Sequence, residues 1–578
     1  MNPLAIELNR TLEGTVAGDL LSDLGRRLYF PKGIVAQSAE AKKHAKRMNA
    51  TIGIAYRGGR PMYLGSIRSL LDKLEPEEIF PYAPTQGLEP LRELWKKELL
   101  RKNPDLAGAA FSLPLVVPGL TAGIATLADL FAGPGVPVVL PDLQWDNYPL
   151  VFETRREARL LTFPFYAAGG GFNVEGMAGA LRDAGREGRA ILLLNFPNNP
   201  TGYSPTKAEA EAIVAAVRES ARSGTRILAI TDDAYFGLFY EPETFTQSLF
   251  ARFCGLDERV LAAKVDGSTK EDLTWGFRTG FVTLGAKGLG DAHYEALTRK
   301  LMGAVRSSVS NSSVLAQSVV LRAVRSPAYE AEKREAYETL RERYGRVKAI
   351  LAARTSDVLR PLPFNSGYFM SFRLAKGKAE DLRRELLMQD GVGTIAIDER
   401  VLRVAFSSVD VADLEALFAR HWNQVYGLLF RLVGEHAEAE DLALEVFWRY
   451  HYHPPAERDA QRLGGWLYRV AVRLGYNALR AQRRRSRYEE SAGRQGLEID
   501  YQLDPASQVE HAEMRRQVQQ VLAQMKPRAA KILILRYTGL SYAQIAATLE
   551  LPLGSIGTWL ARAEADFHKR YEQTWRRE

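Results

Sequence analysis

Short apolar runs alternate with longer amphipathic segments through the first half of the chain. Five runs between residues 100 and 300 read as buried strands: PLVV (114–117), PVVL (137–140), AILLLNF (190–196), RILAITD (226–232) and GFVTLG (280–285). The segment KAEAEAIVAAVRESARSG (207–224) repeats its apolar positions with the period of a helix. Strands that alternate with helices predict a largely parallel sheet covered by helices on both faces, the α/β class.

The pattern changes near residue 420. No strand-like run follows, and segments such as QVYGLLFRLVG, AEDLALEVFWRYH, GGWLYRVAVRLGYNALR and SYAQIAATL space their apolar residues about 3.6 apart. This part of the chain is therefore predicted to be all-helical. A polar stretch without periodicity, residues 486–510, is interpreted as a linker between two helical units. A length of 578 residues suits about three to four folding units.

Composition excludes several classes of protein. Hydrophobic residues make up 46% and charged residues 25%, which is typical of globular domains. The single cysteine, Cys254, excludes a disulfide framework and a multi-cysteine metal site. The first 30 residues show no signal peptide, and the uncharged stretch from Leu106 to Ala128 contains prolines and glycines that favour strand–turn–helix over a membrane span. We expect a cytoplasmic protein with no membrane association.

The net charge of +8 does not separate the two halves, but arginines cluster in one segment. From His421 onward, 23 Lys and Arg face 19 Asp and Glu, whereas the stretch from Arg462 to Arg487 has eight arginines and no acidic residue. A basic helix with interleaved aromatics suits a nucleic-acid backbone and stacked bases. A helical bundle with a solvated basic face gives the same pattern.

Four segments carry polar residues where strands are predicted to end, which is where ligands collect on such sheets. VVPGLTAGI (116–124) reads as a strand, a glycine turn and a helix start, whose amides and Thr121 hydroxyl suit a phosphate. The other three are NFPNNPTGY (195–203), TDDAYFG (231–237) and VDGSTKEDLTWGFRTGF (265–281). Each segment alone is typical of an ordinary loop.

In this order, the four segments resemble those of class I aminotransferases, fold-type-I pyridoxal-phosphate enzymes, over residues 40–415. The resemblance implies a homodimeric enzyme that binds pyridoxal 5'-phosphate. It implies a three-layer αβα large domain over residues 61–300, and a small α/β domain formed by residues 1–60 and 301–415.

The resemblance also implies roles for individual residues. Lys270 matches the lysine that forms the Schiff base with the cofactor and, once freed, shuttles the substrate proton. Asp232 matches the carboxylate that keeps the pyridine nitrogen protonated. Tyr235 and Asn199 match the two donors to the phenolate oxygen. The remaining matches, for phosphate binding, ring stacking and a contact to the partner subunit's phosphate, are Gly119, Leu120, Thr121, Arg278, Trp145 and Tyr82.

One position departs from the pattern of the aspartate aminotransferases. Gly267 stands three residues before the lysine, where those enzymes often have a serine. A hydroxyl that contacts the phosphate is then missing, and Ser268 or Thr269 is the expected replacement.

The substrate residues implied by the resemblance lie in three other segments. Arg403, in VLRVAFSS, matches the arginine that grips the substrate α-carboxylate through two parallel hydrogen bonds. Ile52 and Gly53 match a loop that closes over the substrate. Arg306, four residues before Ser310, resembles a partner-subunit arginine that binds a distal carboxylate. We therefore expect a dicarboxylic amino donor, with an aromatic one as the alternative, and a 2-oxo acid as acceptor.

The helical half resembles the bacterial extracytoplasmic-function sigma factors, over residues 416–578. The resemblance implies a polymerase-binding and minus-ten-element domain (416–488), a linker (489–512) and a helix-turn-helix domain (513–578), with core RNA polymerase and promoter DNA as partners. The helix-turn-helix is expected as SYAQIAATLE, the turn LPLG and a second helix SIGTWLARAEADF. The implied DNA-binding residues are Trp466, Arg473, Asn477, Arg480, Arg483, Arg484, Arg485, Ser555, Thr558 and Arg562.

Three positions depart from the sigma-factor pattern. Leu444 occupies a position that is commonly glutamine, and Gly557 and Trp559 stand where Lys and Arg usually contact DNA. Because lost phosphate contacts lower affinity without changing the fold, we expect weak binding of the upstream promoter element.

The junction leaves more than one interpretation open. The enzyme tail, residues 409–420, continues into HWNQVYG without a Pro-, Gly- or Ser-rich linker. The chain is either a genuine fusion or the product of two joined reading frames. If both halves act, the protein is either an enzyme with a fused regulator or a transcription factor whose enzyme fold serves as a ligand sensor. A metal site at His451 and His453 is rejected, because no carboxylate or cysteine partner has ligand spacing.

Overall fold

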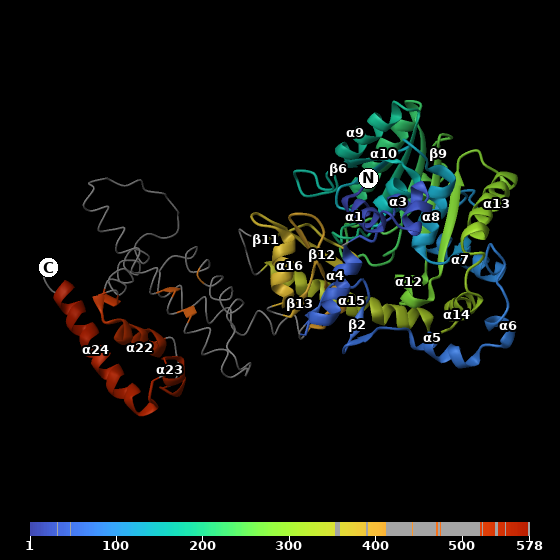
Figure 1. Cartoon of the computed structure of the whole chain (residues 1–578). Helices are drawn as coiled ribbons and strands as arrows, with labels where there is room; N and C mark the ends of the chain where they lie inside the picture. Colours follow the sequence, from blue (N-terminus) through green and yellow to red (C-terminus); the bar gives the residue numbers. More distant parts are fainter. Residues whose placement is uncertain are drawn as a thin grey trace. The chain divides into compact units, whose positions relative to one another are not determined.

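The computed structural model describes two compact units, Met1–Val411 and Ala412–Glu578. In the first unit it describes every residue except 32, 47, 353–358 and 389–390. In the second it describes 442, 470–471, 474–475, 521–522, 524–537, 542–549 and 551–575. Figure 1 labels the helices and strands of both units.

A seven-stranded sheet forms the centre of the first unit, in the order β4-β10-β9-β8-β7-β5-β6. Neighbouring strands from β9 to β6 are parallel, and β10 is antiparallel to both β4 and β9. The strands are β4 Leu115–Val117, β5 Pro137–Pro141, β6 Arg159–Phe163, β7 Arg189–Asn195, β8 Arg226–Asp232, β9 Val260–Asp266 and β10 Gly280–Ala286.

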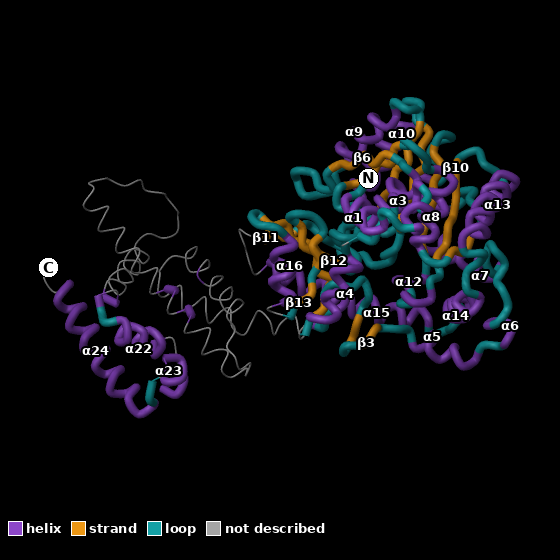
Figure 2. Tube along the Cα trace, viewed as in Figure 1, coloured by secondary structure: helices purple, strands orange, loops and turns teal. Residues whose placement is uncertain are grey.

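Helices cover both faces of this sheet (Figures 1 and 2). Strand β8 shows the division, because Leu228 and Ile230 enter one hydrophobic core while Ile227 and Ala229 enter the other. The first core takes side chains from α8 Leu120–Phe131, α13 Asp291–Ser308, α14 Val314–Val324 and α15 Tyr329–Ala352. The second takes them from α7 Glu89–Lys102, α9 Val174–Gly185, α10 Lys207–Arg222 and α11 Leu249–Phe253.

A second, smaller sheet lies in the C-terminal part of this unit, in the order β11-β12-β15-β14. Its strands are antiparallel, and helix α16 Ala379–Met388 contacts β14 and β15. The strands are β11 Leu359–Pro361, β12 Phe369–Leu374, β14 Ile395–Ala396 and β15 Val401–Ala405. Two further pairs of short strands complete the unit: β1 Met48–Asn49 is parallel to β13 Val392–Gly393, and β2 Tyr56–Arg57 is antiparallel to β3 Arg60–Pro61.

Short helices complete the unit. They are α1 Pro3–Leu12, α2 Val16–Leu20, α3 Asp23–Arg27, α4 Ile34–His44, α5 Gly65–Leu70, α6 Pro76–Ile79 and α12 Ser268–Glu271, with single turns at Leu71–Lys73, Pro104–Leu106, Leu150–Thr154, Trp275–Phe277 and Phe406–Ser408. Among the described residues, no helix is long and apolar enough to cross a membrane.

In the second unit the structure describes three helices near the end of the chain, α22 Pro527–Tyr537, α23 Tyr542–Leu549 and α24 Leu553–Trp575. Ile532, Ile545, Ile556 and Leu560 bring all three into one hydrophobic core. Helix α24 begins within the segment expected as a turn and continues beyond Phe567, because Phe567 and Tyr571 extend its apolar face onto the same core.

The predicted α/β architecture and the helical hairpin near the C-terminus are confirmed. All five apolar runs are strands of the seven-stranded sheet, and residues 207–222 form α10. The expected helices and linker between 412 and 520 lie outside the described residues, apart from five isolated positions.

Candidate active site

The carboxyl ends of β7, β8 and β9 bring three of the predicted segments together. In the parallel register Asn195 pairs with Asp232, and Asp232 pairs with Val265 of β9. Lys270 follows β9 on the short helix α12. The amide of Asn195 donates to the Asp232 carbonyl at 2.8 Å and its side-chain oxygen accepts from the backbone N–H of Asn199 at 2.9 Å, so one side chain fixes both neighbouring loops.

Lys270 and Asp232 lie on the same side of the sheet, as the cofactor assignment requires. The Lys270 ammonium lies 4.4 Å from the centre of the Tyr235 ring. Burial lowers the pKa of Lys270 to about 8; the nearby Asp232 carboxylate opposes this shift and the Arg278 guanidinium adds to it. The amine is therefore neutral near physiological pH in a substantial share of molecules, which is the form that acts as nucleophile or base.

Asp232 is almost fully buried, at 3% exposure. Burial raises its pKa, while a hydrogen bond from the Tyr148 hydroxyl and the charge of Lys270 act in the opposite direction. Tyr148 Oη donates to Asp232 Oδ2 at 2.6 Å, and the ring of Trp145 packs edge-to-face on Tyr148 at 5.4 Å between centroids. Trp145, which is predicted to stack on the cofactor ring, therefore contacts Tyr148, and Tyr148 in turn contacts the Asp232 carboxylate.

The predicted phosphate-binding residues meet at the start of α8. Gly119 has φ +88°, and a Cβ at this position would lie 2.4 Å from Arg278 Nη2, so the arginine packs directly against the glycine turn. Leu120 and Thr121 open the helix behind it, with their amide groups in the first turn. A guanidinium beside a helix N-terminus is a cradle for a phosphate.

The departure at Gly267 has a steric cause. A Cβ at this position would lie 2.5 Å from the Thr279 carbonyl oxygen and 2.8 Å from Gly280 Cα, so a serine does not fit. Of the two expected replacements, Ser268 is engaged, because its hydroxyl accepts from Thr274 at 3.0 Å. Among the residues that the structure describes, the buried Thr269 hydroxyl has no hydrogen-bond partner, so it is free to contact a phosphate.

Arg403 lies at 1% exposure on β15 and faces the same site. Its Nη1 donates to Asn199 Oδ1 and its Nη2 to the Thr51 carbonyl, each at 2.7 Å, and its guanidinium stacks on Phe369 at 4.3 Å. Burial lowers the pKa of Arg403 to about 10, and its Nε has no hydrogen-bond partner among the described residues. A buried guanidinium with an unpaired N–H suits a carboxylate ligand.

The loop predicted to close over the substrate lies against these residues. A Cβ at Gly53 would lie 3.2 Å from both Tyr235 Oη and Phe369 Cζ, and the neighbouring Ile52 is half-buried. Arg306 and Tyr82, both expected to act on a partner subunit, are exposed in the single chain, Tyr82 at 91%. Arg306 donates to Ser310 Oγ at 2.6 Å.

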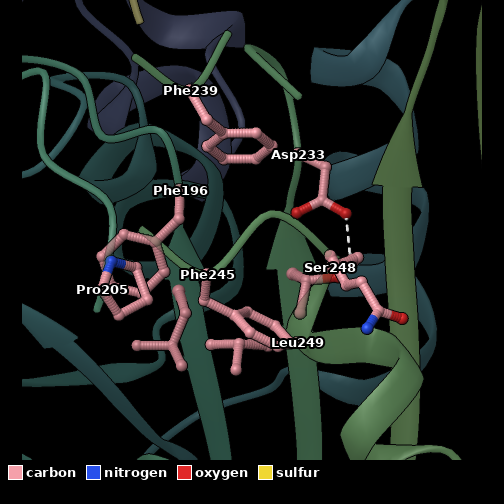
Figure 3. Close-up of a pocket in the computed structure, with 10 residues that line it drawn as sticks. Phe196, Pro205, Asp233, Phe239, Phe245, Ser248 and Leu249 are labelled. Atoms are coloured by element: carbon pink, nitrogen blue, oxygen red, sulfur yellow. Dashed lines mark hydrogen bonds between the residues drawn. The ribbon is translucent and has the colours of Figure 1, made fainter. Parts of the chain in front are cut away.

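Sequence reasoning missed Tyr148, Asn195 and Phe369, which all contact predicted site residues. Tyr148 stands three residues after Trp145, and Asn195 directly ends an apolar run, so their positions carried some signal. The adjoining carboxylate, Asp233, points to the opposite face of the sheet, where it pairs with Lys264 and accepts a hydrogen bond from Ser248 Oγ at 2.5 Å (Figure 3). A small cavity on that face is lined mainly by apolar side chains such as Phe196, Phe239 and Phe245.

The expected recognition helix carries few cationic side chains on its outer face. Thr558 and Arg562 are exposed on α24, while Ser555 is half-buried. Trp559 packs partly into the core, and the Arg528 guanidinium lies 5.3 Å from its ring. The other expected DNA-binding residues, Trp466, Arg473, Asn477, Arg480, Arg483, Arg484 and Arg485, lie outside the described residues, as does Leu444.

Comparison with known families agrees with this geometry. The family described as aminotransferase class I and II matches residues 63–420. The chain belongs to this family. Sigma-70 region 2 matches residues 417–485 and sigma-70 region 4 matches residues 515–566. This class I and II aminotransferase is therefore fused to C-terminal sigma-factor regions of the extracytoplasmic-function type, and the first two matches overlap at residues 417–420.

Curated relatives match each half of this aminotransferase fusion separately. The extracytoplasmic-function sigma factor SigW of Bacillus subtilis is 26% identical over 181 residues, which is 30% of this chain and 95% of the relative. A probable N-acetyl-LL-diaminopimelate aminotransferase of the same organism is 22% identical over 343 residues, which is 57% of this chain and 76% of the relative.

Solved structures of aminotransferases share the fold of the first unit. An aminotransferase from Anaerococcus prevotii matches with a TM-score of 0.60 and 22% identity, covering 68% of this chain and 96% of that structure. The aspartate aminotransferase from Thermus thermophilus with maleate matches with a TM-score of 0.56 and 19% identity, covering 68% and 97%. Members of the family typically bind pyridoxal phosphate, and the buried Thr269 hydroxyl, the Gly119–Arg278 cradle and the unsatisfied Arg403 Nε fit that cofactor and a carboxylate substrate.

Proposed function

We propose that the first unit is a pyridoxal-phosphate-dependent aminotransferase that exchanges the amino group of an L-amino acid with a 2-oxo acid. The observation that carries this proposal is the Lys270 amine, with a pKa lowered to about 8, between Tyr235 and the buried Asp232. When bound, pyridoxal phosphate supplies an aldehyde that condenses with amines and a protonated ring that accepts the electron pair of the substrate α-carbon.

Different residues of the chain would bind the ring nitrogen, the phenolate oxygen, the ring face and the phosphate of the cofactor. Asp232, oriented by Tyr148, holds a proton on the ring nitrogen, and Tyr235 and Asn199 donate to the phenolate oxygen. Trp145 covers the ring face. Gly119, Leu120, Thr121, Thr269 and Arg278 hold the phosphate, with Tyr82 of a second copy as an additional donor in a homodimer.

Substrate recognition, proton transfer and the exclusion of water depend on four other residues. Arg403 binds the substrate α-carboxylate through two parallel hydrogen bonds, and its unpaired Nε supports this role, with Asn199 orienting the guanidinium. The Lys270 Nζ, neutral above about pH 8, takes up the proton from the substrate α-carbon. Ile52 and Gly53 exclude water from the site.

A dicarboxylic amino donor is the proposed substrate class, with Arg306 of the second copy binding the distal carboxylate. An aromatic donor is the alternative. Steady-state rates with aspartate, glutamate and phenylalanine test this choice, and a dicarboxylate preference lost in Arg306→Ala supports it. An unchanged preference in that variant contradicts the assignment of Arg306.

The cofactor assignment is tested by absorbance. The purified chain is expected to show the near-ultraviolet or visible band of covalently attached pyridoxal phosphate, and Lys270→Ala to lack it. Lys287→Ala, at an exposed lysine that follows β10, is the matched control and keeps the band. A band that persists in Lys270→Ala contradicts the assignment of the lysine.

The second candidate function is transcription initiation, favoured by the two sigma-factor regions at 417–485 and 515–566. Sigma-factor regions imply binding of core RNA polymerase and promoter DNA, and this proposed role supports a cytoplasmic location. The full chain is expected to co-purify with core polymerase at low salt and to bind promoter DNA in a salt-sensitive way through Arg483–Arg487. Failure to bind core polymerase contradicts this function, and intact mass of the native protein distinguishes a genuine fusion from two joined frames.

A further inference from the structure

Directly after Lys270, two carboxylates enter a buried cluster of charges. Lys333 Nζ of α15 lies 2.8 Å from Glu271 Oε1 and 3.1 Å from Asp272 Oδ1. Lys102 of α7 also pairs with Glu271 Oε1, and Tyr329 Oη of α15 donates to Asp272 Oδ1 at 2.6 Å. We call these five side chains the charge cluster. It joins the segment after the reactive lysine to two long helices.

The cluster is shielded from solvent and balanced in charge. Exposure of the four charged side chains ranges from 2% for Asp272 to 17% for Lys333. Burial raises the pKa of Glu271, but the two lysines outweigh this and lower it below its usual range. Burial lowers the pKa of Lys333, but the carboxylates of Asp272 and Glu271 outweigh this and raise it. Lys333 therefore depends on its carboxylate partners to remain charged in this buried position.

The cluster fixes one end of α12, a helix too short to be stable alone. At the other end, Thr274 Oγ1 donates to the Ser268 carbonyl at 2.9 Å. Between these attachments lies Lys270, whose backbone carbonyl accepts from Tyr368 Oη at 3.4 Å. A single helical turn keeps its geometry only through such tertiary contacts. The location of the Lys270 amine therefore depends on how firmly Glu271 and Asp272 are held.

The same helix that supplies Lys333 also reaches the substrate side of the site. Further along α15, Arg343 binds Asp410 Oδ1 at 2.7 Å and the carbonyl of Ser407, just beyond the strand that carries Arg403. Residues on one rigid element keep their separation. Helix α15 therefore contacts both the segment of the amine and the segment of the carboxylate-binding arginine.

We propose that Lys333 is a positioning residue for Lys270. Its ammonium, held between Glu271 and Asp272, fixes the end of α12 and with it the placement of the Lys270 amine over Tyr235 and toward Asp232. This proposal rests on the proposed aminotransferase function. The groups that face Lys270 itself are Asp232, Tyr235, Tyr368 and Arg278.

The test compares Lys333→Met with the wild-type chain, both loaded with pyridoxal phosphate. Methionine keeps the length of the side chain and tolerates burial. We expect the pH midpoint of the cofactor absorbance to shift by about half a unit or more and kcat to fall about tenfold, with KM for the amino acid nearly unchanged, since a displaced amine affects proton transfer more than binding. If Lys333 were merely structural, Lys333→Met would lower Tm but leave the absorbance midpoint and the kcat of the folded enzyme unchanged. That result would overturn the proposal.

A second variant separates folding from positioning. Lys333→Met combined with Asp272→Asn removes one charge of each sign and keeps an acceptor for Tyr329. We expect it to recover much of the lost Tm while the absorbance midpoint remains shifted, because the link from α15 to Glu271 is still missing. A wild-type midpoint in this folded variant overturns the proposal.

The matched control is Lys348→Met, a half-exposed lysine on the same helix that lies 3.7 Å from Glu241. It is expected to change neither the midpoint nor kcat. If the wild-type chain itself shows no cofactor band, the proposed function fails and this proposal fails with it. A wild-type band with an unshifted Lys333→Met midpoint contradicts the positioning role alone.

Discussion

Tyr148 and Asp232 share a hydrogen bond of 2.6 Å between two buried side chains. Because this bond favours the charged carboxylate, Tyr148→Phe raises the pKa of Asp232 further. We expect pyridoxal phosphate to bind about tenfold more weakly, since a hydrogen bond to a charged group contributes about 1.5–3 kcal/mol. Titration of the cofactor into the cofactor-free variant, followed by absorbance, measures this.

A tyrosine elsewhere in the fold provides the control for that variant. Tyr294 is buried and donates to the Ala110 carbonyl at 2.7 Å. Tyr294→Phe is expected to lower Tm without changing cofactor affinity. If Tyr148→Phe and the wild type bind pyridoxal phosphate with equal affinity, Tyr148 does not contribute to cofactor binding.

The lowered pKa of Lys270 predicts a pH dependence that is measurable without cofactor. The neutral amine is the nucleophile, so acylation of Lys270 is expected to rise with pH with a midpoint at about pH 8, whereas an ordinary lysine has a pKa near 10.4. Arg278→Gln removes a nearby cation and is expected to move the midpoint upward; Asp232→Asn removes an anion and moves it downward. Competitive labelling with mass spectrometry gives the midpoints, and shifts of the opposite sign would contradict the geometry described.

Arg403 donates hydrogen bonds from both of its Nη atoms, so we expect that another cationic side chain at this position does not restore its function. Arg403→Lys keeps a cation but loses the planar fork that holds Asn199 and the Thr51 carbonyl. We expect kcat/KM for an amino acid to fall about 100-fold, mainly through KM. Arg400→Lys, at an exposed arginine just before β15, is the control and is expected to behave as wild type. A similar KM in both variants would indicate another carboxylate site.

The steric environment of Gly267 predicts a selective loss of stability. Gly267→Ala places a Cβ 2.5 Å from the Thr279 carbonyl oxygen and is expected to cost about 1–3 kcal/mol of unfolding free energy. Gly303→Ala, within α13, places its Cβ more than 4 Å from every described atom outside the local helix backbone, and it is expected to stabilise by about 0.5–1 kcal/mol. Thermal unfolding compares the two, and equal Tm values would mean that the β9–α12 turn adapts freely.

The first two turns of α24 carry no cationic side chain, so we expect a lysine added there to strengthen DNA binding. Gly557→Lys is sterically allowed, because its Cβ would lie 3.6 Å from Tyr542 Cε2. With core polymerase bound, we expect tighter promoter binding and a salt dependence steeper by about one ion. Gly557→Ala separates helix stabilisation from the added charge. An unchanged salt slope in Gly557→Lys would mean that this face does not approach the phosphates.

Much of the large sheet could be predicted from the sequence, because β4, β5, β7, β8 and β10 are uninterrupted apolar runs. Strands β6 and β9 were missed for physical reasons. The edge strand β6 is only half-buried, and β9 contains Lys264, whose buried charge is balanced by Asp233 and Asp266. A lysine within an apolar run signals a strand only when its distant partners are known.

The candidate site was predictable in its motifs and not in its supporting contacts. Residues near Lys270, Asp232, Asn199 and Arg278 carry family patterns, and strand ends bring them together. Phe369, which contacts Arg403, and Lys333, which contacts the two residues after Lys270, come from segments whose local sequence gives no sign of the site. Such contacts join residues that are far apart in the sequence and meet only when the helices pack, so no local pattern in a single sequence predicts them.

The end of β8 places consecutive aspartates on opposite faces of the sheet. Asp232 faces Tyr148 and Lys270, while Asp233 neutralises Lys264 beneath. Inserting one residue in this strand would place Thr231 beside Tyr148 in place of the carboxylate, and deleting one would place Ala234 beside Lys264 and leave its ammonium unpaired in the interior. The strand therefore tolerates substitution along its length far better than any change in its number of residues.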